Sequence, residues 1–525
     1  MNHLKGDIKK VERLEEVVGI LFRQQLGYII EKLDLDSRLP IHKRLRAKRH
    51  SKPAPERLRE TFEELGTVFI KFGQILSERP DLIPEEYCDE LSKLQNSVQG
   101  FHPDEAKKIV DEEVGLENFD RFKEKPLAAA SIAQVHKARL EDGREVVVKI
   151  RRPGIREEVE RDLDILLYLA KKADKHIDLG ENFIYNEVKE FAEWTREELD
   201  FKNERRNIEE FRENMRDEEN VRVPEPYGKY CTDKVLTMEY VDAVKCDNVE
   251  NIQAMEVDEE EVARTGIRSV LKQILRDGLL HADPHPSNFM VDNDGNLVFL
   301  DFGMMTRITE KTQRELGMMM LQISNEDIDG VMETIERLSR VEDDADLDTL
   351  QEEVQTQILK MRNTTIQEQS VSKVIIKTSM KAAQCGVYLP TRITLIGKGF
   401  LTMEGIGLKI YPEFKPQESY REQVEKLLIE QNNPQTMMKN LALNLIQNQD
   451  VITKLPEKIN HNLETGISGE HRHEVKVDST KTPLIPILLI GSSTLLITGS
   501  VISRELLYIG LAELAIGLYL YRQSN

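Results

Sequence analysis

Four side chains in three separate segments have the types and the spacing that phosphoryl transfer requires. Lys149 ends an apolar run, Asp283 and Asn288 lie in the segment HADPHPSN, and Asp301 opens the tripeptide DFG after a second apolar run. A lysine at the end of a strand can reach the α and β phosphates of a nucleotide. Magnesium prefers the carboxylate and amide oxygens that Asp301 and Asn288 offer. Asp283 occupies the place of a catalytic base. The segments therefore predict binding of ATP or ADP with Mg²⁺, followed by phosphoryl transfer.

The order of these segments along the chain is that of the protein-kinase signature set. Each segment alone is a weak signal, and Lys149 could be a surface lysine, while Asp283 could cap a turn. These alternatives do not explain the shared order. A metal site formed by His281 and His285 competes for the same loop, but no third ligand is indicated, and one proline lies between the two histidines and another follows them.

Short strands and longer helices must position these groups. The dipeptide Asp142-Gly143 predicts a hairpin turn that leads into a strand over Glu145–Ile150. Further strands are expected over Val235–Val241 and Leu297–Leu300, and helical patterns cover most of the remaining chain. A small sheet beside a larger helical region indicates an α+β fold.

Several motifs resemble the UbiB family of atypical protein-kinase-like proteins, which is tied to ubiquinone and other isoprenoid-lipid metabolism. The segment Lys71-Phe72-Gly73-Gln74 resembles the KxGQ motif, which is the most specific of them, and HADPHPSN and the alanine-rich loop Ala128–Ser131 also match. Arg152-Pro153-Gly154-Ile155 resembles the RPG segment and Glu198-Leu199-Asp200 the ExD motif. The resemblance covers residues 10 to 440, and a C-terminal anchor pair recurs in the family.

The resemblance implies a protein-kinase-like bilobal fold with a helical N-terminal extension and a C-terminal transmembrane helical hairpin. It also implies a role for each matching residue. The alanine-rich loop would replace the glycine-rich phosphate loop, and Met238 would be the gatekeeper beside the backbone that holds adenine. Lys149 would pair with Glu204, while Lys71 would reach toward Glu198 and Asp200. The residues implied to bind the nucleotide are Ala128, Ala129, Ala130, Ser131, Lys149, Glu204, Glu239 and Val241. The family-motif residues are Lys71, Gly73, Gln74, Glu198 and Asp200. The implied catalytic residues are Lys71, Lys149 and Asp283, and the implied metal ligands are Asn288 and Asp301.

A KxGQ helix that lies over the acceptor side would block a protein substrate, so the resemblance favours ATP hydrolysis or a small, lipid-linked acceptor. On a helix Lys71, Gln74 and Glu78 share one face and can point together. Three departures are visible: Ser287 stands where the family has Gly, no APE follows the DFG, and an inserted helix must separate Lys149 from Glu204. A protein kinase that acts in trans and a non-enzymatic, nucleotide-switched lipid-binding scaffold remain the alternatives.

The C-terminal region contains two apolar runs, Pro483–Ile502 without a charge and Leu506–Tyr521 with Glu513 as its only charge. A helix over the first run would be about 30 Å long, which matches one bilayer core. We expect a membrane hairpin, with a buried helical hairpin as the alternative. Lys481 and Arg522 flank the pair, which predicts a cell-membrane protein with its kinase-like domain on the cytoplasmic side. The hairpin could also mediate a homodimer.

Apolar residues at helical spacing between Val11 and Ile30 predict an amphipathic N-terminal helix. The basic run Lys43–Arg49 is either a solvated linker or a contact for anionic lipid headgroups. The expected organisation is an amphipathic helix and basic linker (1–50), a helical KxGQ extension (51–125), a kinase-like N-lobe (126–245), a helical C-lobe (246–448), a polar tether (449–482) and the transmembrane hairpin (483–525).

The composition excludes several other classes of protein. The 525 residues include 73 Lys and Arg against 94 Asp and Glu, so the net charge is −21 and nucleic acid is not an expected partner. The mean hydropathy of −0.47 excludes a polytopic transporter. Cys88, Cys231, Cys246 and Cys385 lie too far apart for a disulfide scaffold or a cysteine zinc site. The expected partner is a membrane lipid or an isoprenoid intermediate.

Overall fold

The computed structural model describes residues 8–24, 26, 52–77, 79, 82–94, 100–176, 183–283, 285–363, 371–416, 420 and 424. The chain divides into two units, Met1–Met437 and Met438–Asn525, and all described residues belong to the first unit. The predicted basic run, polar tether and transmembrane hairpin lie outside the described residues. Among the residues that are described, no helix is long and apolar enough to cross a bilayer.

An antiparallel sheet of five strands forms the first layer of the fold. Its strands are β1 (Phe119–Phe122), β2 (Ala128–Ala129), β3 (Ala133–Leu140), β4 (Glu145–Arg151) and β6 (Val235–Glu239). The order is β1-β3-β4-β6, with β2 paired to β3. The turn between β3 and β4 contains the predicted Asp142-Gly143 pair, and Gly143 has the positive φ of 89° that favours glycine there.

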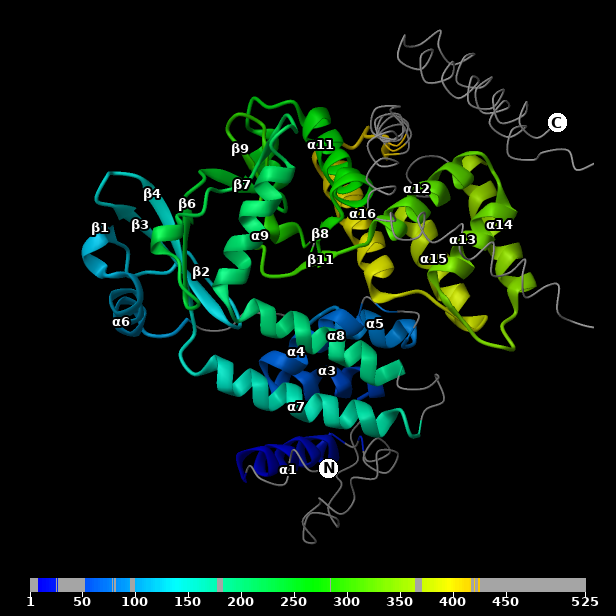
Figure 1. Cartoon of the computed structure of the whole chain (residues 1–525), viewed down its shortest axis with the longest axis horizontal. Helices are drawn as coiled ribbons and strands as arrows, with labels where there is room; N and C mark the ends of the chain where they lie inside the picture. The colour runs from blue at the N-terminus through cyan, green and yellow to red at the C-terminus, as the bar shows by residue number, and fades with distance from the viewer. Residues whose placement is uncertain are drawn as a thin grey trace, which may run out of the picture. The chain divides into compact units, whose positions relative to one another are not determined.

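Helix α6 (Pro103–Val114) covers the sheet, and Figure 1 shows this helix beside β1 and β3. Ala106 and Val110 of this helix are fully buried and share a hydrophobic cluster with Val146 and Val148 of β4. The sheet begins with β1, upstream of the predicted lobe boundary at residue 126. Residues assigned to the KxGQ extension therefore belong structurally to the sheet layer.

Two long helices are inserted between β4, which carries Lys149, and α9 (Phe201–Asn214), which carries Glu204. They are α7 (Ile155–Ala173) and α8 (Phe183–Glu198), where the sequence predicted one inserted helix. The helices α3 (Ala54–Leu65), α4 (Thr67–Leu76) and α5 (Glu85–Leu91) form the preceding segment, and α4 contacts α7. Gly66, with φ of 95°, separates α3 from α4.

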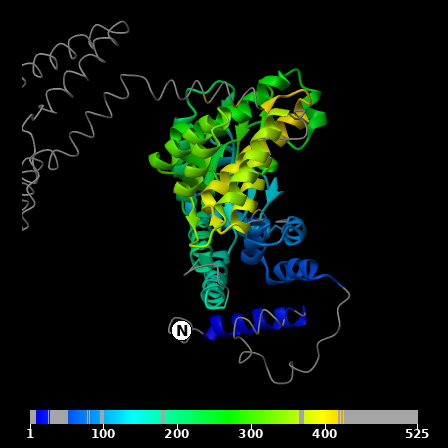
Figure 2. The same cartoon turned by 90° about the vertical axis from the view of Figure 1, so that its right-hand side faces the viewer.

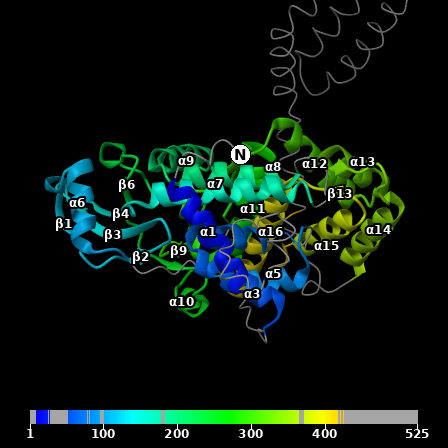
Figure 3. The same cartoon turned by 90° about the horizontal axis from the view of Figure 1, so that it is seen from below.

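The N-terminal helix α1 (Ile8–Arg23) packs against α7, and Figures 2 and 3 show it crossing the outer side of that helix. The Arg13 guanidinium donates to both carboxylate oxygens of Asp162, at 3.0 and 2.9 Å. Leu14 and Val17 are at most 2% exposed. The helix is amphipathic, as predicted, and its apolar face is covered by protein.

Helices α11 (Glu259–Lys272) and α16 (Thr391–Ile410) contact each other and anchor the helical region. A four-stranded sheet, ordered β5-β10-β9-β7, lies in this region, and its strands are β5 (Val221–Arg222), β7 (Ala243–Lys245), β9 (Phe289–Asp292) and β10 (Leu297–Phe299). The short strands β8 (Leu279–His281) and β11 (Met305–Arg307) pair separately.

The remaining described elements are mostly helices. They are α10 (Val249–Gln253), α12 (Glu310–Ser324), α13 (Ile328–Leu338), α14 (Leu347–Asn363) and α15 (Val371–Gln384), with the two-residue strands β12 (Arg340–Val341) and β13 (Val387–Tyr388). Helices α13, α14 and α15 bury a cluster of their own. The predicted α+β class is therefore observed, with the large helical region following the sheet in sequence.

Candidate active site

Lys149, Glu204 and Asp301 meet at one point although they come from three distant elements. The Lys149 ammonium lies 2.7 and 3.0 Å from the two Glu204 carboxylate oxygens and 3.1 Å from Asp301 Oδ1. The side chains of Lys149 and Glu204 are 9% and 1% exposed, whereas that of Asp301 is 44% exposed. The buried pair therefore holds the lysine in place and leaves the aspartate accessible to a ligand.

The charges of this triad support one another. Desolvation of its carboxylate within the site opposes ionisation of Asp301, but the Lys149 charge and its hydrogen bond prevail and lower the pKa of Asp301 to about 2. Burial also opposes the charge on Lys149, yet Asp301 and Glu204 together raise its pKa. Burial raises the pKa of Glu204, and the Lys149 charge offsets part of that effect. Lys149 and Asp301 are consequently charged at neutral pH.

Contacts along one face of α9 hold this helix, and with it Glu204, against the helical region. Asp200 caps the helix by accepting a hydrogen bond from the Lys202 backbone N–H at 3.0 Å. Asn207 donates from Nδ2 to the Phe302 carbonyl at 3.0 Å. The Phe211 ring centroid lies 5.2 Å from that of Phe302. These contacts recur at helical spacing, so α9 and the DFG segment are held as one unit.

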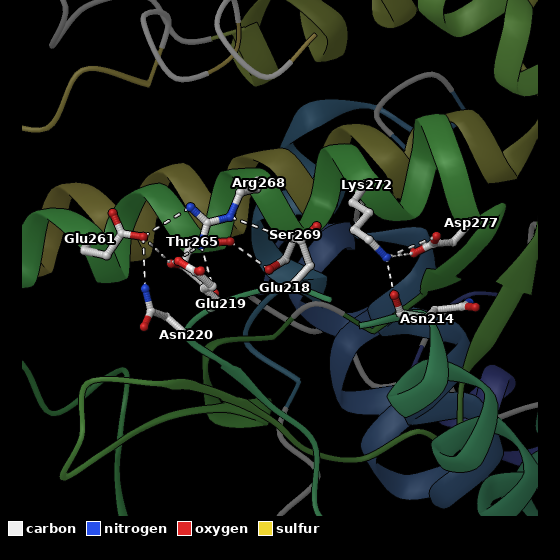
Figure 4. A network of polar contacts seen from close by, with 10 residues as sticks. All are labelled: Asn214, Glu218, Glu219, Asn220, Glu261, Thr265, Arg268, Ser269, Lys272 and Asp277. Carbon is white, nitrogen blue, oxygen red and sulfur yellow. Dashed lines mark hydrogen bonds and ion pairs between the residues drawn. The ribbon is translucent and has the colours of Figure 1, made fainter. Parts of the chain in front are cut away.

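The carboxyl end of α9 is held by a polar network on α11, which Figure 4 shows. Lys272, whose side chain is 1% exposed, donates to the carbonyl of Asn214, the last residue of α9, and pairs with Asp277 at 2.9 Å. Arg268 pairs with Glu218 and with Glu261, each at 3.1 Å. A cation at the end of a helix satisfies a carbonyl that has no partner within the helix and complements the helix dipole.

The loop that carries Asp283 is joined to Asn288 by hydrogen bonds. Asn288 Nδ2 donates to the Asp283 carbonyl at 2.9 Å and to Asp283 Oδ2 at 3.1 Å. Strands β9 and β10 pair Phe289 with Phe299, and the Leu300 N–H donates to the Asn288 carbonyl at 2.9 Å. This register places Asn288 beside the residue that precedes Asp301. The sheet therefore brings the two predicted magnesium ligands to the same end of one hairpin.

Asn288 and Asp301 fit a magnesium ion that also takes phosphate oxygens. The Asn288 amide nitrogen is used by Asp283, which directs its carbonyl oxygen, a hard ligand, to other partners. Asp301 is held at a positive φ of 53°, an uncommon backbone state for a residue other than glycine. Over the described part of the chain, no group of three or more His, Cys, Asp and Glu side chains could hold a metal alone.

The two histidines of the loop bind different partners. His281 Nε2 contacts the Leu300 carbonyl at 3.1 Å, and this side chain lies among the rings of Phe289 and Phe302. His285 Nδ1 contacts Ser287 Oγ at 2.7 Å. The alternative of a two-histidine metal site therefore has no structural support in this loop.

The alanine-rich loop is formed by β2 and the turn into β3. The Ala130 N–H donates to the Ala133 carbonyl at 2.8 Å. The Arg152 guanidinium donates to the Ser131 carbonyl at 3.3 Å and approaches the Ala130 carbonyl at 3.5 Å. Arg152, the first residue of the RPG segment, thus fixes the loop from β4. Ala128 and Ala130 are exposed at the edge of the sheet.

The backbone that is predicted to contact adenine lies at the end of β6. The Glu239 N–H donates to the Glu225 carbonyl at 2.9 Å, and the Glu239 carboxylate accepts from Arg222 at 2.6 Å. The Glu239 N–H is thus bonded within the protein, and contact of adenine with backbone groups near Glu239 and Val241 stays a prediction. Val241 follows two residues later and is 9% exposed, and Met238 is 8% exposed.

Lys71 of α4 forms an ion pair with Glu198, the last residue of α8. Both side chains are about 15% exposed. Burial lowers the pKa of Lys71 to about 8, although Asp283 and Asp301 oppose the shift. A Cβ atom on Gly303 would lie 3.1 Å from Glu198 Cγ, so glycine in the DFG segment allows this close approach. Asp200, the other predicted partner of Lys71, serves as the cap of α9 instead.

Gly73 and Gln74 of the KxGQ motif have packing roles. A Cβ atom on Gly73 would lie 2.5 Å from Leu94 Cδ1 and 2.5 Å from Phe62 Cδ2, so only glycine fits. Gln74 Nε2 donates to the Leu94 carbonyl at 3.1 Å. Helical spacing puts Gln74 on the same face as Lys71, and its contact with Leu94 is one that the spacing did not indicate. Glu78, the third residue of the predicted face, lies outside the described residues.

Lys398 is a residue near the site that no sequence motif indicated. Its ammonium lies 3.7 Å from Asp283 Oδ1, and it belongs to α16, far downstream of every recognised motif. It is flanked by glycines in an apolar helix, and the sequence offered no spacing rule that links it to Asp283.

The fold and the triad define the class: a small antiparallel sheet and a helical region joined around Lys149, Glu204 and Asp301 are the features of an atypical kinase-like protein. The ABC1 atypical kinase-like domain matches residues 93–335. The chain belongs to the UbiB (ABC1) family of atypical protein-kinase-like proteins, as its motifs predicted.

Three relatives illustrate the range of the family. The chain is 33% identical over 433 residues to the uncharacterised protein sll1770 of Synechocystis sp., covering 81% of this chain and 74% of that protein. It is 30% identical over 475 residues to a probable protein kinase UbiB of Shewanella piezotolerans, covering 88% and 86%. It is 36% identical over 361 residues to the chloroplastic protein ACTIVITY OF BC1 COMPLEX KINASE 7 of Arabidopsis thaliana, covering 68% of this chain and 52% of that protein.

Proposed function

We propose that this protein binds ATP or ADP with magnesium and performs phosphoryl chemistry as an ATPase or an atypical kinase. The observation that carries the proposal is the ion pair between Lys149 and Glu204 with Asp301 at 3.1 Å. A charged lysine held in this way can neutralise the α and β phosphates. Asp301 and Asn288 would bind the metal, and magnesium would supply charge neutralisation along the phosphates. Asp283 would position and deprotonate the acceptor.

We further propose that the acceptor is water or a small, lipid-linked molecule. Support comes from α4, whose Lys71 pairs with Glu198 and whose charge interacts with those of Asp283 and Asp301. A helix in this position occupies space that an extended peptide would need. Membership of the UbiB family supports a role in quinone or other isoprenoid-lipid biosynthesis.

The cell membrane, with the kinase-like domain on the cytoplasmic side, is the proposed location. The support is the charge-free run Pro483–Ile502 and the cations that flank the apolar pair. A kinase-like unit anchored in this way would have direct access to lipid-linked intermediates at the membrane surface.

Thermal denaturation of the full chain in detergent tests the nucleotide site. Addition of Mg-ATP or Mg-ADP is expected to raise the midpoint temperature, because a ligand that binds only the folded state stabilises it. The Asp301→Asn variant should lose most of this increase. Asp294→Asn, an exposed position in the turn of the same hairpin, is the matched control and should keep it. An equal increase for the wild type and Asp301→Asn would refute the proposed site.

A further inference from the structure

Lys398 lies beside Asp283 in the candidate active site although it belongs to none of the recognised motifs. Its ammonium is 3.7 Å from Asp283 Oδ1, while Asp283 Oδ2 accepts from Asn288 at 3.1 Å. At 3.7 Å the contact with Asp283 is an ion pair that exceeds the length of a normal hydrogen bond. The side chain of Lys398 is 21% exposed and that of Asp283 is 43% exposed. Both can therefore meet a ligand.

The other two lysines near Asp283 are held by carboxylates elsewhere in the site. Lys149 is fixed between Glu204 and Asp301, and the proposed function assigns it to the α and β phosphates. Lys71 pairs with Glu198, the last residue of α8. Lys398 lies 3.7 Å from Asp283, the carboxylate proposed to position the acceptor. A transferred phosphoryl group needs a cation at this position.

Helix α16 gives Lys398 a rigid base. Ile396 and Phe400, on either side of it in sequence, are 5% and 0% exposed. A Cβ atom on Gly397 would lie 3.0 Å from Ile375 Cγ2, so this glycine permits close packing against α15. The helix also packs along α11, whose network holds α9. Lys398 is thus positioned by the same scaffold as Glu204.

We propose that Lys398 is a catalytic residue that binds the oxygens of the γ-phosphoryl group. The inference rests on the proposed nucleotide function and extends it. In hydrolysis the oxygen of water forms a bond to the γ-phosphorus, and the bond to the β–γ bridging oxygen breaks with its electron pair going to ADP. The proton of the attacking water passes to Asp283. Lys398 neutralises the charge on the γ-phosphoryl oxygens while this exchange takes place.

Nucleotide titration of the full chain in detergent tests this role. The variants are Lys398→Met and Lys398→Arg, with Lys409→Met, at an exposed position of the same helix, as the control. The ligands are Mg-ADP and the magnesium complex of a β,γ-imido analogue of ATP. Lys398→Met should weaken binding of the ATP analogue by about tenfold and leave binding of ADP within about twofold, a loss typical of one charged contact. Lys398→Arg should keep part of the affinity for the ATP analogue that Lys398→Met loses.

The ratio of the two affinities separates a γ-phosphoryl contact from a structural role. A structural defect would weaken ADP and the ATP analogue equally, and that result would overturn the inference while the nucleotide site stands. Unchanged affinities for both ligands in Lys398→Met would also overturn it. Failure of the wild type to bind either nucleotide would refute the proposed function, and this inference with it. The ATP hydrolysis rate of Lys398→Met is expected to fall at saturating ATP, whereas that of Lys409→Met should match the wild type.

Discussion

Lys71 is a charged residue in a site that disfavours its charge. Its pKa in the folded protein is about 8, against 10.5 for an ordinary lysine, because burial outweighs the nearby carboxylates. Between these two values the unfolded chain binds more protons than the folded one, so this group makes the protein more stable as the pH rises. Lys149, by contrast, lies against two carboxylates that raise its pKa. The two lysines therefore respond differently to pH.

The change Lys71→Met should remove this pH dependence. The free energy of unfolding of the wild type, relative to that of the variant, should increase by on the order of 2 kcal/mol between pH 7 and pH 10. Denaturant titrations at pH 7, 8.5 and 10 measure the difference, with Lys409→Met as the baseline. A wild-type advantage that is constant over this range would contradict the assignment.

Gly73 is the motif residue whose packing is tightest. In Gly73→Ala the added Cβ would lie 2.5 Å from Leu94 and Phe62 carbon atoms, so the variant should lose about 1–3 kcal/mol of stability through overpacking. Gly19→Ala in α1 is the control, since no heavy atom lies within 4 Å of its Cβ and alanine favours helix. Chemical denaturation measures the free energy of unfolding of the Gly73→Ala and Gly19→Ala variants. Equal stability of both variants would show that the Gly73 contact is relieved without cost.

At the scale of elements, α9 connects the nucleotide lysine to the helical region. Glu204 near its beginning binds Lys149, Phe211 contacts Phe302, and Asn214 at its end is held by Lys272. The sequence predicted the pairing of Lys149 with Glu204 by resemblance. It could not indicate Lys272, because a buried lysine in a helical pattern has no period or motif that distinguishes it from a solvated one.

Lys272→Met tests how strongly the end of α9 is fixed. The variant leaves Asp277, 7% exposed, without its cation, so the expected loss is about 3–5 kcal/mol of stability. The double variant Lys272→Met/Asp277→Leu should regain at least half of that loss, because it leaves no buried charge unpaired. Denaturant titration measures both. A double variant that is less stable than Lys272→Met would show that Asp277 has another essential partner.

Some elements followed from the sequence and others did not. The Asp142-Gly143 turn and the strand that ends near Lys149 have local signals, since a positive φ and alternating apolar residues are encoded over a few positions. The contribution of α6 and β1 to the sheet layer was missed because their apolar residues are compatible with several partners. The contact of Gln74 with Leu94 was also not predicted, because helical spacing gives a shared face and does not give the neighbour that the face meets.

At the scale of the whole molecule, the proposed membrane anchor depends on the run Pro483–Ile502. Replacing Leu489 and Leu495 by arginine should prevent stable insertion, since each arginine costs about 2.5–3.5 kcal/mol near the centre of a membrane helix. Membrane fractionation with a carbonate wash should then release the variant, while the corresponding double alanine variant should stay in the pellet. Retention of the arginine variant would argue against this segment as the anchor.

The candidate site as a whole was more predictable than its surroundings. Lys149, Asp283, Asn288 and Asp301 were identified because phosphoryl transfer restricts both residue type and order along the chain. Lys398 escaped notice because a helix can bring any part of the chain to the site, and tertiary packing alone decides which residue arrives. Short sequence motifs thus indicate some residues of a site, while the residues that join them from elsewhere are determined by tertiary packing.

The most direct test of the central claim is the rate of ATP hydrolysis by the full chain with magnesium, in detergent and in phospholipid vesicles. The account predicts measurable turnover by the wild type that depends on magnesium and falls at least about tenfold in Asp283→Asn, because the base that receives the proton is lost. The same rate in the wild type and in Asp283→Asn would contradict the account and would favour a nucleotide-switched scaffold.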